Sequence, residues 1–115
     1  MDRAGRPDPL RERFLRAFLD WVMLSIIERK PTFGYEMITT ITGEFGVYIS
    51  PGTLYPILSN LEQSGYIEGA WDPPESKFKK IYRITPEGTK SLQDGLDHIG
   101  AVISSLRRNN GGQHE

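Results

Sequence analysis

The chain has 115 residues, a formal net charge of −1 and no cysteine. Its length suits one domain, and the lack of cysteine excludes disulfides, thiol nucleophiles and thiolate zinc sites, as expected in a reducing cytoplasm. The most apolar segment, RERFLRAFLDWVMLSIIERK, is interrupted by Asp20 and is followed by no small-residue cleavage site. This argues against a signal peptide and a membrane span, so we expect a cytoplasmic protein with no membrane partner.

Charge is distributed unevenly along the chain. Residues 1–30 hold seven basic and five acidic side chains, whereas residues 31–76 hold six acidic ones and no basic one. Residues 77–115 hold seven basic and four acidic side chains. A model in which the protein binds nucleic acid must therefore draw its positive charge from the two ends.

The N-terminal third predicts an arm and a long helix. Residues 1–9 contain two prolines and no apolar periodicity, which is typical of a flexible arm. From Leu10 to Ile26 apolar residues recur at helical spacing, which predicts one helix that ends near Lys30, because Pro31 disfavours helical geometry before it. Arm and helix carry basic side chains that could bind phosphates: Arg3, Arg6, Arg11, Arg13 and Arg16.

Two shorter helices should follow. The first is predicted from about Tyr35 to Phe45, where glycines end it. Ser50 and Pro51 then suit the N-cap and first position of the next helix. A helix, a short turn and a capped second helix form the helix-turn-helix pattern.

The capped helix has two distinct faces. Leu54, Leu58 and Leu61 fall on one face and should be buried. The opposite face is small and uncharged, unlike an ordinary solvated helix face. Asn and Gln can pair with adenine, and Thr and Ser can contact bases, so we expect this face to bind base edges. Its candidate residues are Thr53, Tyr55, Pro56, Ser59, Asn60 and Gln63.

After Gly65 the apolar period changes from 3.6 to about two. YIEGAW and KKIYRIT, residues 66–71 and 79–85, predict two strands joined by a turn in DPPESKF. A hairpin in this place is the wing of a winged helix-turn-helix, and Trp71 is expected to pack between wing and body. Four basic side chains of the wing are predicted to bind phosphates: Lys77, Lys79, Lys80 and Arg83.

A final helix is predicted from Thr85 and Pro86, again a cap followed by proline. Its apolar residues step by four and three, a narrow seam that suits packing on another helix. The seam consists of Leu92, Leu96, Ile99, Ile103 and Leu106. Gly95 and Gly100 are unfavourable in a helix, which suggests that a neighbouring helix approaches closely there. Residues 109–115 are expected to be disordered.

Three motifs resemble the PadR family of transcriptional regulators: FGYEM (33–37), GTLYPILSNLEQSGYIEGAW (52–71) and KKIYRITPEG (79–88). The resemblance spans roughly residues 20–90 and implies an α+β fold, mainly α with a small β-hairpin. A winged helix-turn-helix would occupy residues 10–90 and a dimerisation helix residues 91–108, as in the smaller branch of the family. Where many relatives carry a basic residue before the Leu-Glu pair, this chain has Ser59-Asn60, which leaves the operator sequence open.

The same resemblance implies a homodimeric repressor bound to a near-palindromic site in double-stranded DNA. Tyr55 would contact the DNA backbone, and Tyr35 would help to fix the second helix. Dimer contacts would come from the first and last helices, through Phe14, Phe18, Trp21, Leu92, Leu96, Ile99, Ile103 and Leu106. Family members commonly respond to aromatic small molecules at the dimer interface. Here the available side chains are Phe14, Phe18 and Trp21, although core and dimer packing would also explain them.

The sequence has two competing interpretations, an enzyme and a protein-binding module. An enzyme is not expected, because no phosphate-binding glycine loop, nucleophile elbow or metal-spaced cluster is present. No cofactor or metal is therefore expected. Glu62 should form a local hydrogen bond or pair with a neighbouring basic side chain rather than act as a catalytic acid. The serious alternative is a winged-helix module for protein–protein interaction without sequence-specific DNA binding, whose acidic middle would repel DNA.

Overall fold

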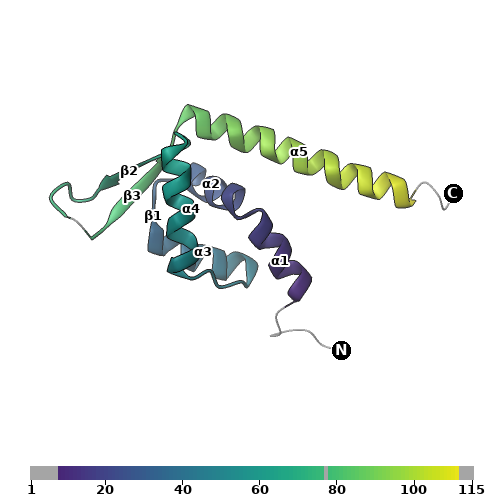
Figure 1. Cartoon of the computed structure of the whole chain (residues 1–115), viewed down its shortest axis with the longest axis horizontal. Coiled ribbons are helices and arrows are strands. Elements are labelled where there is room, and N and C mark those ends of the chain that lie inside the picture. The colour runs from purple at the N-terminus through teal and green to yellow at the C-terminus, as the bar shows by residue number, and fades with distance from the viewer. Residues whose placement is uncertain (1–7, 77, 112–115) are drawn as a thin grey trace.

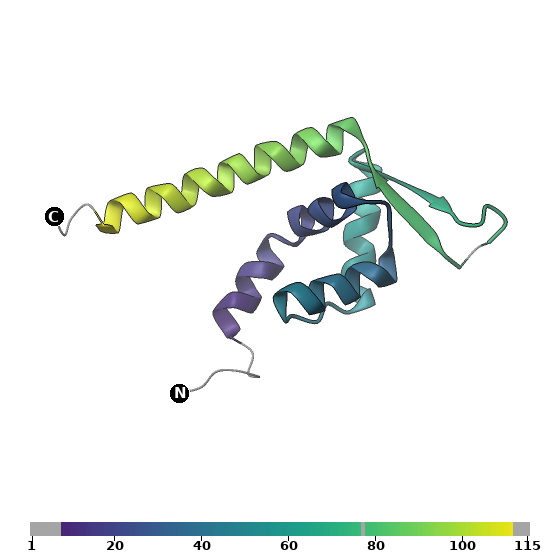
Figure 2. The ribbon, with the colours of Figure 1, turned by 180° about the vertical axis from the view of Figure 1, so that it is seen from behind.

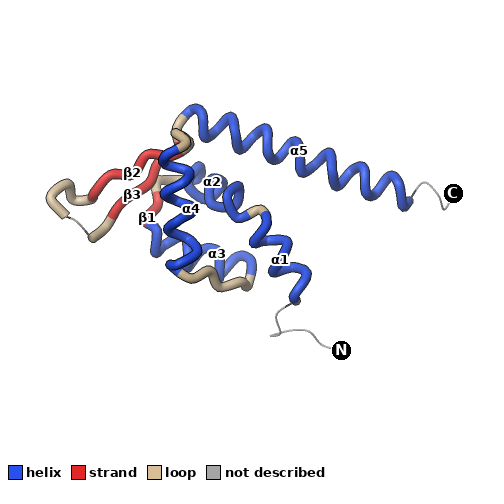
Figure 3. The backbone as a smooth tube through the Cα atoms, in the orientation of Figure 1, coloured by secondary structure: helices blue, strands red, loops and turns tan. Residues whose placement is uncertain are grey.

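The computed structural model describes residues 8–76 and 78–111, with side chains up to residue 108. Within these ranges the chain forms five helices and a small antiparallel sheet (Figures 1 and 3). In chain order the elements are α1 (Pro9–Ala17), α2 (Leu19–Arg29), β1 (Thr32–Phe33), α3 (Gly34–Phe45), α4 (Pro51–Gln63), β2 (Ile67–Trp71), β3 (Lys80–Ile84) and α5 (Pro86–Gly111). Helices α2, α3 and α4 form the body, from which the β2–β3 hairpin and α5 project to opposite sides (Figures 1 and 2).

The single N-terminal helix predicted up to Lys30 is wrong, because the chain breaks at Phe18. Its backbone has φ −105° and ψ 18°, and its N–H donates to the carbonyls of Phe14 and Leu15 at 3.3 and 3.1 Å. Leu19 beyond the break is buried, whereas Phe14 before it is 58% exposed. The break therefore divides the apolar stripe into a core helix, α2, and an outer helix, α1.

The predicted helix-turn-helix is confirmed in α3 and α4. Gly46 ends α3 with a left-handed φ of 70°, and its N–H donates to the Thr42 carbonyl at 2.9 Å. Helix α4 begins at Pro51, although the Ser50 hydroxyl bonds the Thr53 hydroxyl at 3.3 Å and caps no backbone N–H. The leucine stripe of α4 is buried as predicted and joins a core made by α2, α3, the α3–α4 connection, α4, β2, β3 and α5. The core consists of Leu19, Met23, Leu24, Ile26, Ile27, Met37, Ile41, Ile49, Leu54, Leu58, Leu61, Ile67, Tyr82 and Leu92.

The hairpin belongs to a three-stranded sheet in the order β1-β3-β2. The strands β2 and β3 confirm the prediction, whereas β1 was missed because two residues are too few to show periodicity. Its register pairs Thr32 with Tyr82 and Phe33 with Ile81. Trp71, expected to pack between wing and body, is 41% exposed and lines a pocket between the hairpin and the body together with Gly34 and Tyr55.

Helix α5 is held to the body at its first turn. The Thr85 hydroxyl accepts from the Gly88 N–H at 3.0 Å and donates to the Gly65 carbonyl at 2.6 Å. A Cβ at Gly95 would lie 2.4 Å from Cε2 of Trp21, so α2 does approach α5 there, whereas nothing lies within 4 Å of a Cβ at Gly100.

The predicted limits of α5 and of the arm differ from the structure. The helix continues to Gly111, so that residues 109–111, expected to be disordered, are helical. Residues 112–115 of the predicted tail and residues 1–7 of the predicted arm lie outside the described ranges. None of the helices described is long and apolar enough to cross a membrane.

Candidate nucleic-acid interface

The exposed face of α4 carries the side chains predicted to contact bases. All six are exposed: Thr53, Tyr55, Pro56, Ser59, Asn60 and Gln63. The single charged residue of α4, Glu62, is partly buried and hydrogen-bonded to the hairpin. The face therefore offers hydroxyl and amide groups without a competing charge.

Two tyrosines lie where α3 begins beside α4. Tyr55 comes so close to Gly34 that a Cβ there would lie 2.6 Å from the tyrosine oxygen. Tyr35 is 52% exposed and stacks on Phe33, with ring centroids 5.7 Å apart. Both tyrosines line one pocket of about 350 Å³ together with Lys79 and Lys80. The structure thus brings the predicted residues of α3, α4 and the wing to one place, and Gly34, the glycine of the FGYEM motif, leaves room there for the Tyr55 ring.

The basic residues of the wing do not form one cluster, because side chains alternate between the two faces of a strand. Lys79 and Arg83 are exposed on one face, where the Lys79 Nζ lies 5.9 Å from the ring centroids of both Phe33 and Tyr35. Lys80 lies on the other face, toward α4, with its Nζ 3.1 Å from the Glu62 carboxylate. Lys77 lies outside the described residues.

This geometry confirms the expectation that Glu62 bonds to a neighbouring basic side chain, here Lys80. It also shows that Lys80, predicted to bind phosphate, is already paired within the protein. Beside this pair, the pKa of the Tyr82 phenol is raised above its ordinary value, chiefly by burial and further by the charges of Glu62 and Tyr55. The buried Tyr82 ring forms the inner wall of the wing beside the Glu62–Lys80 pair.

The basic side chains of α1, on the side of the body away from the hairpin (Figure 1), differ in their surroundings. Arg11 and Arg13 are exposed. Arg16 is bound to the Glu12 carboxylate at 2.9 Å and to the Tyr48 carbonyl at 3.3 Å. The predicted Arg3 and Arg6 lie outside the described residues.

The structure thus has an exposed, uncharged helix face next to a basic wing. The sequence also matches the model of a known protein family over most of its length. Residues 23–94 match the model of the Transcriptional regulator PadR-like family. The chain belongs to the PadR-like family. This confirms the family and the α+β winged-helix fold expected from the sequence, and members of the family are transcriptional regulators rather than enzymes.

Related proteins and structures agree with this assignment. The Transcriptional activator GvpE2 of Halobacterium salinarum is 30% identical over 90 residues, which are 77% of this chain and 42% of that protein. The Transcriptional regulator Rv3488 of Mycobacterium tuberculosis is 33% identical over 57 residues, 50% of this chain and 53% of that protein. The chain therefore spans about half the length of these curated relatives.

Two solved structures share the fold over 84% of this chain, each with a TM-score of 0.75. A transcriptional regulator from Clostridium thermocellum, Cth-833, is 28% identical, and the match covers 96% of it. A PadR family transcriptional regulator from Eggerthella lenta is 29% identical, with 84% covered.

In this PadR-like chain the apolar seam of α5 is divided between the body and the surface. Leu92 is buried against the body and Ile99 is half-buried, whereas Leu96, Ile103 and Leu106 are exposed. On the N-terminal side, Phe18 and Trp21 stack with ring centroids 5.8 Å apart, and Phe14 meets Phe18 edge to face at 4.9 Å. Only part of the predicted dimer surface is therefore buried by contacts within one chain.

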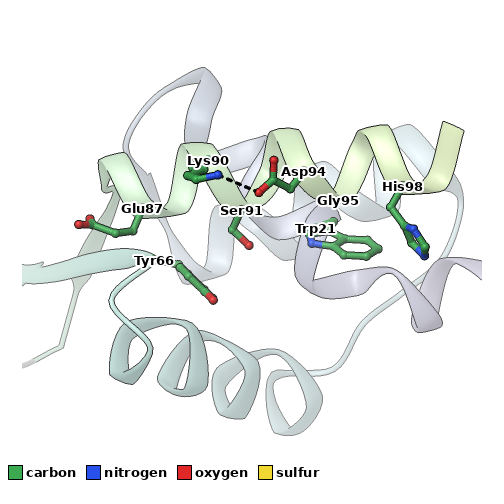
Figure 4. Close-up of a pocket in the computed structure, with 8 residues that line it drawn as sticks. All are labelled: Trp21, Tyr66, Glu87, Lys90, Ser91, Asp94, Gly95 and His98. Atoms are coloured by element: carbon green, nitrogen blue, oxygen red, sulfur yellow. Dashed lines mark hydrogen bonds and ion pairs between the residues drawn. The ribbon is translucent and has the colours of Figure 1, made fainter. Parts of the chain in front are cut away.

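The three aromatic residues proposed for an effector do not share one pocket. Trp21 lines a pocket of about 450 Å³ between α2 and α5, together with Tyr66, Glu87, Lys90, Ser91, Asp94, Gly95 and His98 (Figure 4). Phe14 and Phe18 line a separate pocket of about 230 Å³. Tyr66 and His98 of the larger pocket carried no signal in the sequence, because their proximity depends on how α5 returns over α2. Among the described residues, no group of three or more histidine or acidic side chains could hold a metal ion.

Proposed function

We propose that this PadR-like regulator binds double-stranded DNA sequence-specifically as a homodimer and represses transcription until a small molecule releases it. The observation that carries the proposal is the exposed, uncharged face of α4 beside Lys79 and Arg83 of the wing. Phosphate contacts position a protein on DNA, whereas base contacts specify the sequence. The wing and α1 would supply the phosphate contacts, and α4 would supply the base contacts. The protein would act in the cytoplasm, where the DNA is.

The side chains of α4 favour A·T-containing half-sites. Asn60 and Gln63 are exposed amides that can pair with adenine, and α4 has no arginine to bind guanine. The Tyr55 hydroxyl at the edge of the face is suited to the DNA backbone, and Tyr35 to support of α3.

Replacement of Asn60 by alanine should lower discrimination at particular base pairs by about 1–3 kcal/mol each. The reason is that the amide makes a bidentate contact to one base edge, so its loss leaves the phosphate contacts intact. Binding to duplexes that are substituted one base pair at a time measures this, with Gln93→Ala on the exposed surface of α5 as the control. An equal loss on every duplex would contradict a base contact.

The proposed dimer rests on the exposed part of the α5 seam. Leu96 is 47% exposed and Ile103 is 38% exposed, one and three turns beyond the buried Leu92. A second copy of the chain would cover them together with Phe14 of α1. Two-fold symmetry would then set the two α4 helices about 34–36 Å apart, one turn of DNA.

Leu96→Asp should convert the protein from a dimer, with a mass near twice 13.1 kDa, to a monomer of 13.1 kDa. A buried charge without a partner costs several kcal/mol, enough to separate the subunits. Size-exclusion chromatography with light scattering measures the mass, and Gln93→Asp on the same helix is the matched control. A parent protein that already runs at 13.1 kDa would contradict the dimer.

Repression and release by an effector are the most detailed parts of the proposed function. The relative from Halobacterium salinarum is named an activator. Repression is proposed for this chain on the basis that a dimer bound over a promoter would block access to it. Trp21 contributes an aromatic wall to the pocket between α2 and α5, so a planar aromatic ligand there would contact the helix proposed to hold the dimer. Phe14 and Phe18 would act from the separate, smaller pocket.

A further inference from the structure

Glu62 joins the recognition helix α4 directly to the wing. Its carboxylate accepts from the Gly69 N–H of β2 at 3.3 Å and from the Lys80 Nζ of β3 at 3.1 Å. The side chains of Lys80 and Glu62 are only 29% and 33% exposed. Partial burial reduces the screening of this pair by salt.

The surroundings of Lys80 are shaped to hold its ammonium group inside the wing. The Nζ lies 5.6 Å from the centroid of the Trp71 ring and 5.8 Å from that of Tyr82, distances that suit cation–π attraction. The lysine stem passes over Gly69, where a Cβ would lie 2.8 Å from its Cε. Glycine at this position therefore makes room for the partly buried Lys80 side chain.

The neighbouring lysine has a different setting. Lys79 is exposed on the opposite face of the hairpin, and no carboxylate within 4 Å pairs with it among the described residues. The two adjacent lysines therefore differ in their surroundings, because strand alternation directs Lys80 toward Glu62 of α4 and Lys79 toward the exposed rings of Phe33 and Tyr35.

We propose that Glu62 is a positioning residue that neutralises Lys80 and fixes the wing relative to α4. The wing then binds phosphate through Lys79 and Arg83, while Lys80 holds the wing to α4 through its ion pair with Glu62. This inference rests on the proposed DNA binding. Its consequence is that the chain keeps a cation close to the DNA surface without using it for sequence-independent affinity, which favours discrimination over tight non-specific binding.

The number of phosphates neutralised can be read from the salt dependence of binding. Each one adds about 0.9 to the slope of log K against log salt concentration. We would measure this slope by fluorescence anisotropy with a mixed-sequence duplex, so that no operator need be known. Lys79→Met and Lys80→Met are the matched pair, since both remove a charge and keep an apolar stem.

Lys79→Met should reduce the magnitude of the slope by about 0.9 per protomer, and Lys80→Met should leave it unchanged. Glu62→Gln should increase it by about 0.9 per protomer, because Lys80 becomes free to bind phosphate. Per protomer, that is an additional loss of about 3.5-fold in affinity between about 50 and 200 mM salt. The double variant Glu62→Gln/Lys80→Met should return the slope to the parent value.

Equal reductions in slope for Lys79→Met and Lys80→Met would overturn the proposal, as would an unchanged slope for Glu62→Gln. Circular dichroism on thermal unfolding shows whether each variant folds, and if Glu62→Gln does not, the lysine pair still decides. Failure of the underlying function looks different, because the parent protein itself would then bind no duplex at any salt concentration.

Discussion

The affinity of the protein for DNA is expected to fall about a thousandfold or more when salt rises from about 50 to 200 mM. A protein that neutralises about six to ten phosphates displaces as many counterions, and higher salt opposes their release. Among the described residues of α1 and the wing, the exposed basic side chains without an ion pair are Arg11, Arg13, Lys79 and Arg83. Doubled in a dimer, this set falls within that range of phosphates.

Titration of a labelled duplex at several salt concentrations measures this loss. The experiment also separates DNA binding from the alternative function as a protein–protein interaction module. The net charge of −1 provides no general attraction to DNA, so a steep slope requires that the basic residues act from one surface. Affinity that is weak and unaffected by salt would favour the protein-binding module.

Replacement of Gly88 by alanine is expected to lower the free energy of unfolding by about 3 kcal/mol or more. A Cβ at this position would lie 2.0 Å from the carbonyl oxygen of Tyr66. That oxygen cannot move aside easily, because it accepts a hydrogen bond from the Thr85 N–H at 3.1 Å. The added methyl group must therefore displace the start of α5 from the junction between α4 and β2.

Urea unfolding followed by circular dichroism measures the effect, and Gly100→Ala in the same helix is the control. Nothing lies within 4 Å of a Cβ at Gly100, so alanine there should stabilise α5 by about 1 kcal/mol through its higher helix propensity. Opposite signs for the two variants are the expected result. If Gly88→Ala were as stable as the parent, the close contact of α5 with Tyr66 would be wrong.

Local signals in the sequence determined the helix-turn-helix and its exposed face. Pro51 at the first position of α4 and the spacing of Leu54, Leu58 and Leu61 depend only on neighbours within two or three turns. The change of period after Gly65 located both wing strands for the same reason. The uncharged face opposite the leucines followed directly, since one buried stripe defines the other side of a helix.

Features that depend on contacts between distant segments were determined only by the tertiary structure. The break at Phe18 and the two residues of β1 carry no local signal, because packing of α2 and pairing with β3 produce them. Two adjacent lysines, Lys79 and Lys80, are alike in sequence, yet α4 places Glu62 beside only one of them. The sequence therefore determined which helix presents the exposed uncharged face, and long-range packing determined which basic side chains near it are paired within the protein.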